Sequence, residues 1–252
     1  MEQQIKFENY QGELLAGTLH PARESSIGAV VAGHCFTCSR HTGILRRVCD
    51  ELSKIGFDVL RFDFSGNGQS QGGFEHSTWS KQILEMEAAI NVMKDRGADW
   101  IGLVGHSLGA AIALLTARKI DSIAAVCRLA GRASASRPTY FLTHAQQETL
   151  TTNGQVEFTS RGRKLTITQA FFDDADSHDL VAATRSLTIP MLVVHGNQDE
   201  IIPVSEAYLA HDTNPKRVKL FVVEGGDHMF SRPAHQQQVG QTVADWFRHQ
   251  VG

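Results

Sequence analysis

The segment that most constrains the fold of this chain is Gly105-His106-Ser107-Leu108-Gly109. An apolar run over residues 101–104 precedes it, and a run typical of a helix over residues 110–115 follows it. The pattern therefore predicts a turn from a strand into a helix with a serine at its apex. A turn this tight leaves no room for side chains at Gly105 and Gly109, so the hydroxyl of Ser107 is expected to be pushed outward.

Short apolar runs elsewhere alternate with segments of helical spacing. Strands that alternate with helices favour an α/β fold with a mostly parallel central sheet covered by helices on both faces. Alternating residues near the N-terminus predict a hairpin that leads into this sheet. The runs expected to form buried strands are 27–32, 58–62, 101–104, 124–129, 191–194 and 219–223, and helical spacing covers 44–52, 83–93 and 239–247.

This pattern breaks between residues 131 and 186. A helix is expected over 138–150, a hairpin around 160–164, and acidic helical pieces over 171–184. The lid carboxylates, Asp174 among them, are interpreted as a solvated face. Because the sheet pattern resumes at Met191, we expect one domain over residues 1–252, with 131–186 inserted as a small lid.

Composition excludes several classes of protein. The chain has 24 Lys and Arg against 27 Asp and Glu, a near balance that gives no reason to expect a nucleic-acid partner. No run of 18 apolar residues predicts a membrane span, and the polar start does not resemble a secretory signal. Four cysteines do not suggest a disulfide framework. We therefore expect a soluble, cytoplasmic protein.

A serine hydroxyl needs a base to become a nucleophile, and the base needs an acid to orient it. The strand at 191–194 runs into a loop that contains Asp199, and the strand at 219–223 runs into one that contains His228. The predicted catalytic triad is thus Ser107, His228 and Asp199. Asp227 is a rival acid, but as the direct neighbour of His228 it is poorly placed to orient that ring, and we interpret it as structural.

Several motifs of the chain resemble the α/β-hydrolase superfamily. These are the serine turn, His195-Gly196-x-x-Asp199, Gly226-Asp227-His228 and the loop Asp63-x-x-Gly66-x-Gly68-x-Ser70. Gly73-Phe74-Glu75 and the lid hairpin are similar to feruloyl (cinnamoyl) esterase-type hydrolases. His34-Cys35-Phe36-Thr37-Cys38-Ser39 resembles the hydrolase half of fusions with an OsmC-type peroxide-reducing domain. The resemblance implies a serine esterase that works without a cofactor.

The oxyanion of an acyl-transfer intermediate needs two backbone N–H donors. Leu108, directly after the nucleophile, and Phe36, in the loop after the first buried strand, are the expected donors. Most of the superfamily has glycine at the position of Cys35, so this side chain is expected beside the substrate. Aromatic residues of the insertion either line an acyl or aryl pocket or attach the lid to the domain. They are Tyr140, Phe141, Phe158, Phe171 and Phe172.

The cysteines and histidines of the chain do not predict a redox or metal site. Cys35 and Cys38 form a C-x-x-C at a strand-to-helix junction, and packing of two small residues is favoured over redox chemistry. The twelve histidines lack metal-ligand spacing, so no metal site is expected. The basic residues of the insertion are interpreted as a solvated turn, with recognition of an acidic substrate as the alternative. They are Arg132, Arg137, Arg161, Arg163 and Lys164.

The sequence thus predicts a serine carboxylesterase for small-molecule esters with short acyl or aryl groups, hydroxycinnamoyl esters among them by resemblance. Other acyl chemistry on the same triad stays open, namely that of a thioesterase, lysophospholipase, aminopeptidase or acyltransferase. A cofactor-free perhydrolase and a non-catalytic ligand-binding relative are further alternatives.

Overall fold

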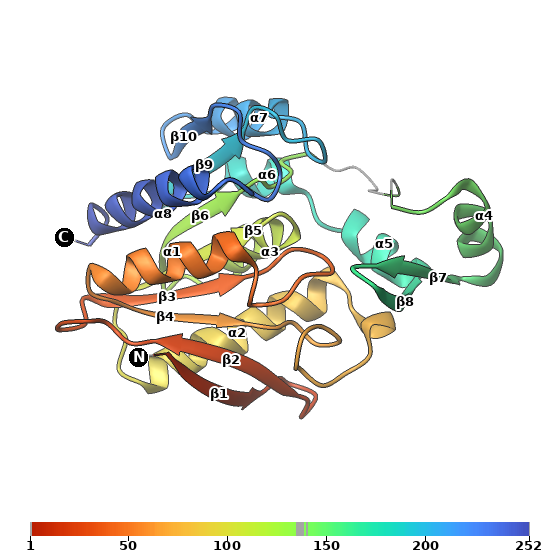
Figure 1. Cartoon of the computed structure of the whole chain (residues 1–252), viewed down its shortest axis with the longest axis horizontal. Coiled ribbons are helices and arrows are strands. Elements are labelled where there is room, and N and C mark those ends of the chain that lie inside the picture. Colours follow the sequence, from red (N-terminus) through yellow and green to blue (C-terminus); the bar gives the residue numbers. More distant parts are fainter. Residues whose placement is uncertain (1, 135–138, 140, 252) are drawn as a thin grey trace.

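The computed structural model describes residues 2–134, 139 and 141–251 of the chain. Within these residues, eight strands form one sheet in the order β1-β2-β4-β3-β5-β6-β9-β10 (Figure 1). The pairs β1–β2 and β2–β4 are antiparallel, and every other pair is parallel. The strands are β1 (Gln3–Glu8), β2 (Leu14–His20), β3 (Gly28–Gly33), β4 (Phe57–Phe62), β5 (Ile101–His106), β6 (Ile123–Leu129), β9 (Met191–Gly196) and β10 (Val218–Val223).

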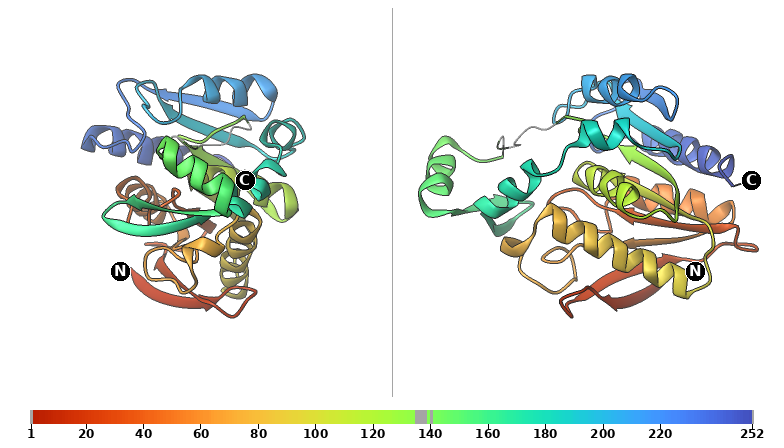
Figure 2. Two further views of the ribbon diagram at one scale, coloured as in Figure 1. Left: turned by 90° about the vertical axis from the view of Figure 1, so that its right-hand side faces the viewer. Right: turned by 180° about the vertical axis from the view of Figure 1, so that it is seen from behind.

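Helices cover both faces of this sheet, as predicted. Helices α1 (Gly43–Lys54) and α8 (Pro233–Arg248) pack together on one face. The other face carries α2 (Trp79–Asp95), α3 (Leu108–Lys119), α6 (Leu180–Arg185) and α7 (Ser205–Thr213), and Figure 2 shows α2 in yellow on the side away from α1. The mostly parallel sheet with helices on both faces confirms the expected α/β-hydrolase fold.

The two apolar cores follow from the alternation of side chains along each strand. In β3, Val30 faces the core under α1 and α8, whereas Val31 faces the core under α2 and α3. Both side chains are buried, which is why this strand reads as a continuous apolar run. The first residues of the sheet alternate instead, because β1 is an edge strand with one face in solvent.

The helices and strands of the insertion between β6 and β9 that precede α6 lie beyond the carboxyl ends of the sheet strands, on the right in Figure 1. It contains α4 (His144–Asn153), the hairpin of β7 (Gln155–Ser160) and β8 (Arg163–Thr168), α5 (Gln169–Asp176) and α6. We call residues 131–186 the lid segment. The predicted hairpin is present, and α4 begins several residues later than expected. Helix α7 and the short 3₁₀ helix η1 (Phe74–His76) were not predicted.

Asp174 corrects the interpretation of the lid carboxylates as a solvated face. Its carboxylate accepts hydrogen bonds from the N–H of Ser80 at 2.8 Å and from the Ser80 hydroxyl at 2.7 Å. These bonds attach α5 to the first turn of α2, where unpaired N–H groups favour a carboxylate. None of the helices in the described part of the chain is long and apolar enough to cross a bilayer.

Candidate active site

Ser107 lies at the turn from β5 into α3, as the glycine spacing predicts. Its backbone has a φ of 56°, a strained conformation for a residue with a side chain. A Cβ at position 105 would overlap the carbonyl of Gly109, and a Cβ at position 109 would overlap that of Gly33. The two glycines are therefore required sterically, and Ser107 is left partly exposed at the carboxyl edge of the sheet.

The structure brings Ser107, His228 and Asp199 together from three loops at that edge. The Oγ atom of Ser107 lies 3.1 Å from Nε2 of His228. On the other side of the ring, Nδ1 of His228 lies 2.8 Å from Oδ2 of Asp199. Because a carboxylate only accepts, Nδ1 carries a proton, so Nε2 of the neutral ring is free to accept the serine proton.

The carboxylate of Asp199 is fully buried, with hydrogen-bond donors around it. One oxygen accepts from the N–H groups of Ile201 and Ile202, and the other accepts from His228 and contacts His195 Nε2 at 3.2 Å. Burial alone would raise the pKa of Asp199, but the bonds from His195 and His228 outweigh burial and hold it well below its usual range. Asp199 is therefore ionised and oriented toward His228.

His106, in the variable position of the serine turn, has a partner that the sequence did not indicate. Its Nε2 lies 2.9 Å from the backbone carbonyl oxygen of His228, to which it can only donate. Burial, and next the charge of His228, lower the pKa of His106 to about 3. The neutral ring therefore holds the backbone of His228 without placing a second positive charge beside it.

Neither Leu108 nor Phe36 has its backbone N–H engaged in the regular hydrogen bonding of its own segment. Leu108 is the first residue of α3, so its N–H has no acceptor within the helix. Phe36 lies inside a turn closed by the bond from the Cys38 N–H to the Cys35 carbonyl at 3.1 Å, and that bond leaves the Phe36 N–H unused. Both residues line the same cleft as Ser107.

Cys35 and Cys38 are not a pair of packed thiols, as the sequence suggested, but form a disulfide around Phe36. The turn brings their Cα atoms to 5.2 Å, within the range that a disulfide bridges. Cys35 therefore does not act as a wall of the cleft, and its side chain is directed to Cys38 instead. Cys49 and Cys127 are buried free thiols, as expected.

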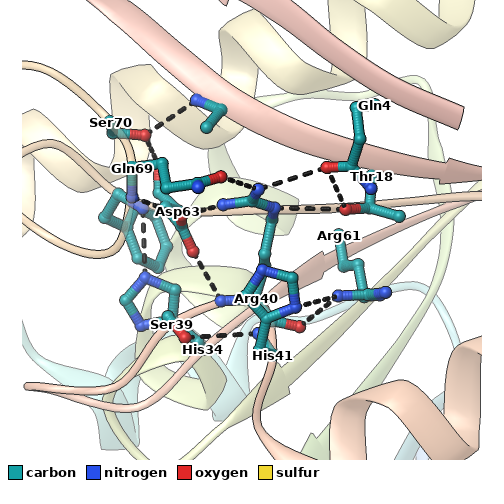
Figure 3. A network of polar contacts seen from close by, with 12 residues as sticks. Gln4, Thr18, His34, Ser39, Arg40, His41, Arg61, Asp63, Gln69 and Ser70 are labelled. Atoms are coloured by element: carbon teal, nitrogen blue, oxygen red, sulfur yellow. Dashed lines mark hydrogen bonds and ion pairs between the residues drawn. The ribbon is translucent and has the colours of Figure 1, made fainter.

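A buried polar network fixes the loop that carries Phe36 (Figure 3). The guanidinium of Arg40 forms an ion pair with Asp63, and both side chains are almost completely buried. Asp63 also accepts hydrogen bonds from the N–H groups of Arg40 at 2.6 Å and Gln69 at 2.9 Å. His34 joins the same two loops, because it accepts from the Phe64 N–H and donates to the Cys35 carbonyl. This pairing was not predicted, since residues 40 and 63 lie far apart in the chain.

The cleft above Ser107 encloses about 500 Å³, including its open mouth. Of the aromatic residues proposed for it, Phe141 and Phe171 line it, together with Phe36. Phe158 and Phe172 do not: Phe158 stacks behind Phe36 at 6.1 Å, and Phe172 is buried against Phe171. Tyr140 and Arg137 lie outside the described residues. The sequence interpretation missed three wall residues: Trp79, Ala111 and Ile202. Arg132, which the sequence interpretation placed among the basic residues of a solvated turn, also lines the cleft.

The structure also shows the surroundings of Asp227 and of the residues that could bind a metal ion. Asp227 accepts hydrogen bonds from the N–H and hydroxyl of Ser231, four residues away, which agrees with a structural role. Within the described ranges, no group of three or more His, Cys, Asp or Glu side chains is arranged to hold a metal ion.

Residues 25–181 match the family model Hydrolase_4, described as serine aminopeptidase, S33. The match covers more than half of the chain. The chain belongs to this family. A solved esterase domain from Rhodothermus marinus is 25% identical, with a TM-score of 0.80, and the alignment covers 100% of both chains. Together, the family and the esterase relatives support a serine-type carboxylic ester hydrolase.

Two other similar proteins have names that point to different substrates. Palmitoyl-protein thioesterase ABHD10, mitochondrial, of Mus musculus is 29% identical over 220 residues, which is 82% of this chain and 71% of the mouse protein. Est1E from Butyrivibrio proteoclasticus, solved with ferulic acid bound, has a TM-score of 0.84 at 23% identity and covers 98% and 99% of the two chains. The likeness to Est1E shows a shared fold.

Proposed function

We propose that this protein is a serine carboxylesterase that hydrolyses short acyl or aryl esters through an acyl-enzyme. The observation that carries this proposal is the chain of contacts from Ser107 through His228 to Asp199. In this mechanism, His228 Nε2 takes the proton of Ser107 as its Oγ attacks the ester carbonyl. The same proton then passes to the departing alcohol, and water repeats the cycle to release the acid.

Backbone donors complete the proposed site. The N–H groups of Phe36 and Leu108 stabilise the negative oxygen of the tetrahedral intermediate. Asp199, kept ionised by its hydrogen bonds, stabilises the imidazolium that His228 becomes. The walls formed by Phe36, Trp79, Phe141 and Phe171 favour an apolar acyl or aryl group.

Replacement of the nucleophile tests the reaction class. Ser107→Ala is expected to lower kcat for p-nitrophenyl acetate by about 10⁴-fold or more, leaving only what binding and the oxyanion donors provide. Ser25→Ala, at an exposed serine on the loop before β3, serves as the matched control and keeps full activity. A fluorophosphonate probe should label the parent protein and not Ser107→Ala. Near-normal turnover by Ser107→Ala would reject the proposal.

A thioester is the second candidate substrate, because the mouse relative is named a thioesterase. An acetyl ester, the matching thioester and the matching anilide, offered to the same enzyme preparation, separate esterase, thioesterase and aminopeptidase activity. We expect kcat/KM to be highest for the ester. The cytoplasmic location stays a prediction from the sequence.

A further inference from the structure

A second cavity, of about 650 Å³ with its open mouth, lies beside the candidate active site. Thr37, Ser39 and His41 line it on the side of the loop after β3, and Arg161 and Arg163 line it on the side of the lid hairpin. Thr37 directly follows Phe36, the proposed oxyanion donor. The guanidinium of Arg161 reaches the sulfur of Met229, next to His228 in the chain, at 3.8 Å. The cavity therefore lies next to the segment that carries Phe36, and Arg161 on its wall contacts the segment that carries His228.

The walls of this cavity are cationic and rich in donors. Among the residues that the structure describes, no carboxylate lies within ion-pair distance of Arg161 or Arg163, and none lines the cavity. Arg163 donates to the Thr37 carbonyl at 3.0 Å and to the Asn67 side chain at 3.3 Å, both of them neutral acceptors. Neither guanidinium therefore forms an ion pair with a described residue, in a protein whose net charge is −3. The hydroxyl of Ser39 adds a polar group to the same walls, whereas the Thr37 hydroxyl is bonded to the Ser160 hydroxyl at 2.8 Å and so joins the loop after β3 to the lid hairpin.

The position of Arg161 in the hairpin is unusual as well. Arg161 and Gly162 form the two-residue turn between β7 and β8, with φ values of 52° and 74°. Asn, Asp or Gly is favoured at the first position of such a turn, and a long cationic side chain is not. The turn nevertheless carries arginine there, directed along the cavity toward Met229.

From these observations we propose that the cavity binds an anionic oxygen group, a carboxylate or a phosphoryl group, carried by the ester substrate. Guanidinium groups bind both anions through paired N–H···O bonds. The inference rests on the proposed esterase function and adds a substrate class to it: esters with a negative charge near the scissile bond. The cleft above Ser107, whose walls are mostly apolar and include one arginine, Arg132, holds one part of such a substrate, and the cavity holds its charged part.

Steady-state kinetics with matched esters tests the inference. Phenyl acetate is compared with the same ester carrying a carboxylate or a phosphonate on the ring, which also separates the two kinds of anion. The measured quantity is the ratio of kcat/KM for the charged ester to that for the neutral one. Arg161→Asn keeps a residue suited to the turn and is expected to lower this ratio about fivefold, mainly through KM. Arg161→Lys keeps the charge and should retain most of the ratio.

Lys164→Gln is the matched control, because it removes the same charge from the same hairpin outside the cavity. Its ratio is expected to equal that of the parent protein. A fall as large as that of Arg161→Asn would mean that only long-range charge matters, and the binding site would be rejected.

Direct binding separates this inference from the esterase proposal. Binding of inorganic phosphate and of benzoate is measured by calorimetry, a measurement that does not require the protein to be active. The two proteins compared are Ser107→Ala and Ser107→Ala combined with Arg161→Asn. Saturable binding that weakens at least fivefold with Arg161→Asn supports the site even if ester hydrolysis fails. Absence of binding, or equal binding by both variants, together with an unchanged kinetic ratio overturns the inference.

Discussion

The ring of His106 donates a hydrogen bond from Nε2 to the backbone carbonyl of His228, 2.9 Å away and 122 positions later in the chain. The residue that precedes the proposed nucleophile thereby holds the loop of the proposed base. A single buried bond thus joins β5 to the loop after β10. Its length and burial suggest that the distance between Ser107 and His228 depends on it.

Removal of this bond should slow the reaction without abolishing it. His106→Leu is expected to lower kcat about tenfold and to cost about 1–3 kcal/mol of stability, because the His228 carbonyl is left without its donor. His106→Gln keeps a donor nitrogen at a similar distance and should restore most of kcat. Steady-state kinetics and urea unfolding measure both effects. Equal kcat for His106→Leu and the parent protein would show that the bond does not position His228.

The buried His20 should make stability depend on pH. Burial, and next the positive charge of Arg61, lower the pKa of His20 to about 4 from its ordinary value of 6.5. As the pH falls below 6.5, His20 binds a proton in the unfolded chain but not in the folded protein. The free energy of unfolding therefore decreases between pH 6.5 and about pH 4. The loss is about 1.4 kcal/mol per pH unit in this window.

His20→Gln provides the comparison, because its side-chain oxygen can accept the bond that Arg61 donates to His20. Urea unfolding gives the free energy of unfolding at each pH between pH 7 and pH 4. The slope of this free energy against pH should be smaller for His20→Gln than for the parent protein, by the amount that corresponds to one bound proton. Parallel curves across this window would contradict the lowered pKa.

The Cys35–Cys38 disulfide should respond to reductants. In the chain-entropy model, closing a loop of four residues stabilises the protein by about 2 kcal/mol, and this amount should be lost on reduction or in Cys35→Ala/Cys38→Ala. We also expect lower kcat, because the turn holds the Phe36 N–H.

Iodoacetamide should label no cysteine of the native protein before reduction and two afterwards. Burial raises the pKa of Cys49 to about 12, which leaves that thiol unreactive. Two labelled cysteines before reduction would rule out the disulfide.

The Arg40–Asp63 pair should be costly to break from one side. Arg40→Met leaves the Asp63 charge buried without a partner, and we expect a loss of about 3–5 kcal/mol in the free energy of unfolding. Arg40→Met combined with Asp63→Asn should lose less than the sum of the single changes. Arg23→Met is the control, because its pair with Asp50 is exposed and worth at most about 1 kcal/mol. Similar losses for Arg40→Met and Arg23→Met would refute a tightly coupled pair.

Local patterns were sufficient to predict much of the fold. The runs at β3, β4, β5, β6 and β9 are readable because buried parallel strands are apolar on both faces, and β10, an edge strand, is readable from its own apolar run. Helix α7 was missed, since its residues carry only a weak apolar stripe: Ala207 and Ala210 are its buried positions. In the lid, alternation predicted the hairpin, but which aromatic rings face the cleft depends on how α5 and the hairpin pack around Phe36.

By itself, the sequence determined the serine turn and the order of Ser107, Asp199 and His228 along the chain. Steric exclusion at Gly105 and Gly109 acts over a few residues, and strand ends can be read from apolar runs. Only the tertiary structure decided that His106 binds the His228 backbone, that Arg40 pairs with Asp63, and that Arg161 and Arg163 line one cavity with Thr37. Each of these joins residues far apart in the chain, and such contacts depend on how loops pack, which no local spacing encodes.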